Sequence, residues 1–83
     1  MTPLEQERLE ILQQSVQQRA REVMYHQINI DNYRLAIAEI EARFTDDKDM
    51  AEFADHLRGL LASSIREQAK EQLMFTVIQS QLE

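Results

Sequence analysis

The chain contains no cysteine and no tryptophan, and it has a single glycine and a single proline among its 83 residues. Without cysteine there is no disulfide, no thiolate zinc site and no cysteine nucleophile. Glycine and proline supply the turns that all-β folds need in quantity, so their scarcity favours an all-α protein. One glycine also leaves no glycine-rich loop for phosphate binding.

Long apolar runs and an excess of positive charge are missing too. No window approaches the ~18 uninterrupted apolar residues of a membrane span, and the first residues lack the pattern of a signal peptide. The 9 basic and 15 acidic residues give a net charge of -6, which opposes direct binding to nucleic acid. We therefore expect a cytoplasmic protein that binds neither membranes nor nucleic acid.

What is present is a seven-residue repeat of apolar residues, which predicts one side of a long helix over residues 3–44. Its members are Leu9, Val16, Val23, Ile30, Ile37 and Phe44. The second row of the same seam is Leu12, Arg19, His26, Tyr33 and Ile40. Arg19 and His26 therefore stand as polar residues in an otherwise apolar seam, where they need partners or access to water.

The start of this helix is marked by Thr2 as N-cap, Pro3 at the first helical position and Glu5 as the partner in a capping box. The segment from Asn29 to Asn32 contains weak helix formers, which allow a kink there. Because the apolar repeat keeps its phase across that segment, the sequence favours a continuous or mildly kinked helix.

A second helix is expected over residues 48–82, with Asp46 or Asp49 as its N-cap. Its apolar stripe comprises Met50, Phe53, Leu57, Leu60, Leu61 and Ile65. A short connection between two long helices predicts an antiparallel two-helix hairpin, so the chain forms a single all-α domain over residues 1–83.

Folding the chain back on itself predicts which residues face each other. If the helices pair antiparallel, residue i lies opposite residue 91 minus i. Arg19 then lies close to Gln72 and Glu71, which can satisfy the guanidinium. Gly59 lies close to Asn32 and Tyr33, where a missing side chain would admit the tyrosine ring.

Several apolar residues fall outside this seam and predict a second contact surface. The first helix carries Met24, Ile28 and Leu35 on its far side with Tyr25 beside them, and the end of the second helix carries Leu73, Met74, Phe75 and Ile78. A two-helix hairpin is marginal by itself, and pairing of hairpins into a four-helix bundle is the usual solution. We therefore expect a homodimer that uses these residues.

Ionisable residues offer little for chemistry. Glu22 and His26, like Glu52 and His56, are spaced to share a helix face, but neither pair has the Glu-x-x-His spacing of carboxylate metal bundles. We expect no catalytic residue, no cofactor and no metal ligand, and hence no enzyme. A metal-binding bundle of carboxylates and histidines remains an alternative function, as does an acidic mimic of DNA.

Two stretches, His26–Ala36 and Met50–Phe53 continuing to Leu60–Ser63, resemble small helical proteins encoded by bacteriophages and prophages. This resemblance implies an accessory or inhibitory protein that acts by binding a host or phage protein in the host cytoplasm. It implies no particular functional residue.

Overall fold

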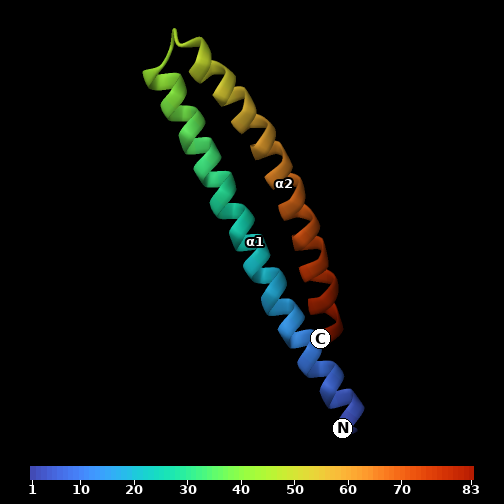
Figure 1. Cartoon of the computed structure of the whole chain (residues 1–83). Coiled ribbons are helices and arrows are strands. Elements are labelled where there is room, and N and C mark those ends of the chain that lie inside the picture. Colours follow the sequence, from blue (N-terminus) through green and yellow to red (C-terminus); the bar gives the residue numbers. More distant parts are fainter.

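The computed structural model describes all 83 residues and consists of two α-helices joined by a short turn (Figure 1). Helix α1 spans Pro3–Arg43 and helix α2 spans Lys48–Leu82. The two helices run antiparallel, which confirms the predicted all-α hairpin. Neither helix has a stretch that is both long enough and apolar enough to cross a membrane.

The hairpin is a thin rod. It measures 67 × 16 × 14 Å and has a radius of gyration of 19.0 Å, whereas a compact domain of this length has a radius of gyration of about 12 Å. The first turns of α1 extend beyond the end of α2 (Figure 1). Each helix therefore has only one neighbour within the chain, and most of its circumference faces outward.

The start of α1 follows the predicted capping box. The Thr2 hydroxyl accepts a hydrogen bond from the Glu5 amide at 3.1 Å, and the Thr2 amide donates to the Glu5 carboxylate at 3.4 Å. The helix then continues without a break through the segment from Asn29 to Asn32. The unbroken phase of the apolar repeat outweighs the low helix propensity of that segment.

The start of α2 differs from the prediction. Its N-cap is Asp47, whose carboxylate accepts a hydrogen bond from the Met50 amide at 3.1 Å, so both Asp46 and Asp49 were wrong. Asp47 has the extended backbone that an N-cap needs. Asp49 instead lies in the first turn of α2, where its negative charge favours the positive end of the helix dipole.

The best-packed part of the seam lies towards the turn. Ile37 and Ile40 of α1 form a buried cluster with Ala54 and Leu57 of α2. The half-buried residues that pack against this cluster are Tyr33, Ala36, Met50 and Leu61. Towards the termini only Ile78 is buried, so the apolar core is concentrated at the turn end of the rod.

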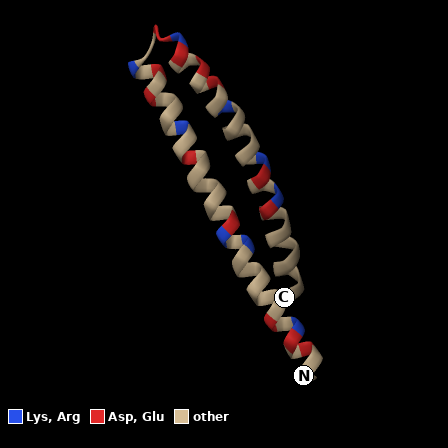
Figure 2. Ribbon diagram, in the orientation of Figure 1, with Lys and Arg blue, Asp and Glu red and all other residues tan.

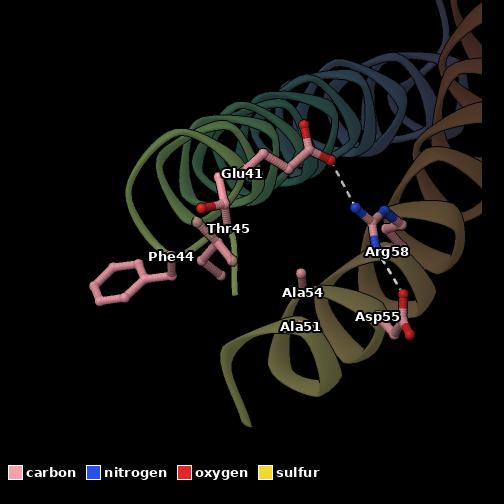
Figure 3. A pocket seen from close by; sticks show the side chains of 8 residues that line it. Glu41, Phe44, Thr45, Ala51, Ala54, Asp55 and Arg58 are labelled. Carbon is pink, nitrogen blue, oxygen red and sulfur yellow. Dashed lines mark hydrogen bonds and ion pairs between the residues drawn. The ribbon is translucent and has the colours of Figure 1, made fainter. Parts of the chain in front are cut away.

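The apolar repeat of α1 ends one step earlier than predicted. Phe44 is not a helical seam residue; it caps the C-terminus of α1 and is 41% exposed. Its ring points away from α2 (Figure 3). The last seam residue of α1 is therefore Ile40, because the chain leaves the helix before Phe44 can turn inward.

Gly59 also lies elsewhere than predicted. A Cβ atom placed on Gly59 would meet nothing within 4 Å, so this glycine makes no room for Tyr33. Gly59 instead lines an open hollow on the outer side of α2 together with Ala62 and Ser63. The prediction was wrong because it considered which residues lie level with each other and not which side of α2 faces α1.

Candidate functional site

The middle of the seam is polar. Arg19 of α1 donates from one guanidinium nitrogen to both carboxylate oxygens of Glu71, at 2.9 and 3.2 Å. The two side chains are 36% and 21% exposed, respectively. Of the two residues predicted near Arg19, Gln72 and Glu71, it is Glu71 that forms the contact. The neighbouring seam residue His26 is half-buried.

A second polar contact adjoins this pair. The side-chain amide of Gln68 donates to the Val23 carbonyl at 3.2 Å and to the Gln27 side-chain oxygen at 2.9 Å. Gln68 therefore adds a hydrogen bond to a backbone carbonyl of α1 across the seam. Sequence reasoning did not identify Gln68 as a seam residue, although the predicted fold-back places it level with Val23.

The hydrogen bonds also identify the two flanks of the seam. Arg8 and Gln81 each directly precede a seam residue, and they are hydrogen-bonded at 2.9 Å along one flank. Glu41 and Arg58 each directly follow a seam residue, and they form an ion pair at 2.7 Å along the other flank. An exposed residue that directly precedes a seam residue therefore lies on the same side of the rod as Arg8, and one that directly follows a seam residue lies on the same side as Arg58.

The predicted contact residues are not all on one surface. Met24, Ile28 and Leu35 are exposed on α1, on its far side and towards the Arg58 flank. Tyr25 is exposed towards the opposite flank, with its ring edge-on to His26 at 5.5 Å. The structure therefore separates Tyr25 from the other three.

The predicted contact residues at the end of α2 also divide. Leu73 and Met74 are exposed, whereas Phe75 is half-buried and Ile78 is 9% exposed. Ile78 thus belongs to the hairpin's own core, because it occupies a seam position opposite α1. Between Gln72 and Leu82, α2 has no charged residue (Figure 2).

Other exposed apolar residues come from the predicted stripe of α2. Phe53 is 48% exposed, and Leu60 is exposed as well. Phe53, Leu60 and Met74 each directly precede a seam residue, as Arg8 and Gln81 do. We call the side of the rod that carries them, with the outward residues Ile11 and Tyr25 of α1 and Val77 of α2, the Phe53 face. Sequence reasoning had assigned Phe53 and Leu60 to the seam because helical spacing alone does not separate a seam from its flank.

A hollow of about 260 Å³ lies beside the turn on the Arg58 flank (Figure 3). Arg58 spans it, donating to Glu41 at 2.7 Å and to Asp55 at 2.6 Å. The pKa of Arg58 is raised, first by its hydrogen bond to Glu41 and also by its contact with Asp55. Since both carboxylates are paired with one cation, the hollow presents no free charged group to a ligand.

The carboxylates are paired with cations along much of the rod. Besides the contacts of Arg19 and Arg58, Glu67 accepts a hydrogen bond from Lys70 at 2.9 Å, and this contact lowers the pKa of Glu67. No three histidine, aspartate or glutamate side chains lie close enough together to hold a metal ion. Acidic and basic residues are interspersed on both helices (Figure 2), so no observation favours the metal-bundle or DNA-mimic alternatives.

The sequence matches no protein-family model, and neither a curated protein nor a solved structure is significantly similar to it.

Proposed function

We propose that this protein is a non-enzymatic helical interaction module that dimerises into a four-helix bundle and acts by binding another protein. The resemblance to small phage-encoded helical proteins suggests an accessory or inhibitory role towards a host or phage protein in the host cytoplasm. The proposed contacts come from the exposed apolar residues on the two helices.

The observation that carries the proposal is the amount of apolar surface left outside. Only six residues are buried, whereas fourteen large apolar side chains are exposed. Scattered single apolar residues are normal on a protein surface, but contiguous ones mark contact sites. Leu35, for example, is 67% exposed and lies one seven-residue repeat after Ile28, so both residues are on the same side of α1.

The total surface area supports the same proposal. The chain exposes 6444 Å², whereas a compact monomer of 9.8 kDa exposes about 5,200 Å² by the usual scaling with mass. The excess exceeds the ~800 Å² that each partner buries in a standard interface. Dimerisation would therefore bring the surface exposed by each chain close to that of a compact monomer of the same mass.

Light scattering after size exclusion, from 1 to 100 μM protein, tests the self-association. Twice the chain mass of 9.8 kDa is expected for the dimer. A mass of one chain throughout this range would refute the dimer.

Binding to another protein needs a separate test. Affinity capture from lysate is expected to retain one stoichiometric protein on the wild-type chain and to lose it when an exposed apolar residue is made charged. Arg21→Glu provides a control, because Arg21 is already charged and exposed on α1. Failure to retain any stoichiometric protein would leave the molecule a dimer without the proposed activity.

A further inference from the structure

We infer that the second copy of the chain packs on the Phe53 face, with the turn end of one hairpin over the terminal end of the other. This inference rests on the dimer proposed above and specifies its surface and orientation. It also separates the dimer contact from the strip formed by Met24, Ile28 and Leu35, which stays on the outside of such a bundle.

The Phe53 face carries more large apolar side chains than the opposite flank. Its exposed residues are Ile11, Tyr25, Phe53, Leu60, Met74 and Val77. The exposed large apolar residues of the opposite flank are Met24, Ile65 and, beside the turn, Phe44. That flank is also bridged by the charged pair of Glu41 and Arg58. Covering the Phe53 face therefore removes more apolar area from water and leaves the Glu41–Arg58 bridge in solvent.

Helix α2 has the apolar pattern of a bundle helix. A helix with one neighbour needs two apolar positions per heptad, whereas a helix in a bundle core has a third position on one flank. In α2 the third position is occupied by Phe53, Leu60 and Met74, interrupted by Glu67 and followed by Gln81. This wider stripe faces solvent in the isolated hairpin, and a helix packed on the Phe53 side would bury it.

The dimensions fit a second copy. One long side of the rod, 67 by 16 Å, has a footprint of about 1,000 Å², compared with the ~800 Å² per partner of a standard interface. A second hairpin has the same length and the same face, so it covers the whole side at once. The contact is then closed by two-fold symmetry and leaves no unpaired apolar end.

Charge selects the orientation. Glu22 and Glu67 lie level with each other on the Phe53 face, with the same offset as the hydrogen-bonded residues Arg8 and Gln81. If both turns were at the same end, Glu22 of each copy would lie over Glu67 of the other, and four carboxylates would meet at one level. Lys70 neutralises only Glu67 within each chain, so this orientation is repulsive.

The reversed orientation staggers these carboxylates and brings the apolar ends together. With the axis near residue 65, Glu67 of one copy lies about 6 Å along the bundle from Glu67 of the other, at 1.5 Å per residue, instead of at one level with Glu22. With the two-fold axis at the middle of the paired helices, near Tyr25, Phe53 of one copy lies over Met74 and Val77 of the other. Glu22 then lies over the region of Asn29. Neighbouring helices are antiparallel in both orientations, as is usual in bundles of hairpins, so charge and not helix direction distinguishes them.

Spin-label distances test the orientation, because the chain has no cysteine of its own. Nitroxides are attached to Glu52→Cys, Arg66→Cys or Ser80→Cys, all exposed on the outer side of α2. With the axis near residue 65, the separation along the bundle between equivalent labels is about 40, 3 and 45 Å, respectively, at 1.5 Å per residue. In the orientation with both turns together, all three pairs are separated only by the width of the bundle.

Equal distances at the three positions would overturn the reversed orientation. The surface is tested with Leu60→Glu, which is expected to weaken dimerisation at least tenfold in sedimentation equilibrium, and with Leu35→Glu as the matched control on the outer strip. A monomeric Leu35→Glu with a dimeric Leu60→Glu would move the contact to that strip and overturn the inference. The label distances still report the orientation if Leu60→Glu fails to fold.

A wild-type chain that is monomeric in the same experiments would refute the dimer itself, which is a different failure. Distances as expected, together with the loss of dimer in Leu60→Glu only, support both the surface and the orientation.

Discussion

Replacing both Arg19 and Glu71 by leucine tests how the polar middle of the seam contributes to stability. The two side chains are joined by hydrogen bonds of 2.9 and 3.2 Å from one guanidinium nitrogen. Each single replacement, Arg19→Leu or Glu71→Leu, leaves the other charged side chain without its partner in the seam. The double replacement gives a seam that is apolar at this level on both helices.

The exposed fractions of the two side chains set the expected size of the effects. Glu71 is only 21% exposed, so leaving it unpaired in Arg19→Leu should lower the free energy of unfolding by about 1 kcal/mol, net of the leucine burial. Arg19 is 36% exposed and can extend its guanidinium to water, so Glu71→Leu should be nearly neutral. The double variant should gain about 1 kcal/mol over the wild type, because apolar replacement of a buried ion pair is often stabilising.

Thermal unfolding followed by circular dichroism at one protein concentration measures these differences. We expect the melting temperature to fall by about 5 °C in Arg19→Leu and to rise by about 5 °C in the double variant, since 1 kcal/mol shifts a domain of this size by 4–8 °C. Glu39 and Arg43 form an exposed ion pair on α1 and serve as a control whose double-mutant coupling should be close to zero. Purely additive effects of the two leucine replacements would refute the reasoning, because they would mean that the pair is not coupled.

Three further predictions concern local contacts. Asp47→Ala should cost about 1 kcal/mol of unfolding free energy in urea titrations because it removes the N-cap of α2, and an equal loss in Asp49→Ala would contradict that assignment. Gly59→Ala should raise the free energy of unfolding by about 1 kcal/mol because helix propensity improves and the added methyl meets open space; destabilisation would show that another chain covers Gly59. Lys70 lowers the pKa of Glu67, so this ion pair stabilises the fold at neutral pH and its contribution is lost as the pH falls through the folded-state pKa. Carboxyl NMR titration should therefore show a higher pKa for Glu67 in Lys70→Gln than in the wild type, and an unchanged value would refute the contact.

Much of the fold follows from local patterns in the sequence. The capping box of Thr2 and Glu5, the unbroken α1 and the antiparallel hairpin all depend on interactions between residues close in the chain or on one regular period. The pairing of Arg19 with Glu71 also follows, because the short turn leaves little freedom in how far one helix slides along the other.

Other features depended on where α1 ends and on how α2 is rotated about its axis, and local sequence patterns determine neither. Three aspartates near the turn can each cap α2, and the choice of Asp47 depended on where α1 ends. The apolar residues of α2 fit more than one stripe, and rotation of α2 about its axis placed Leu57 inside while leaving Phe53 and Leu60 outside.

The sequence by itself thus determined that the chain forms two long helices and which residues lie level with one another. The helical period depends on residues close in the chain, and the short turn limits how far one helix can slide along the other. Only the tertiary structure decided which side of each helix faces the other. A single helical neighbour covers no more than a narrow stripe at a 3.5-residue period, so the remaining apolar residues of α2 stay exposed. That leftover stripe, from Phe53 to Met74, is the basis for the proposed contact with a second chain.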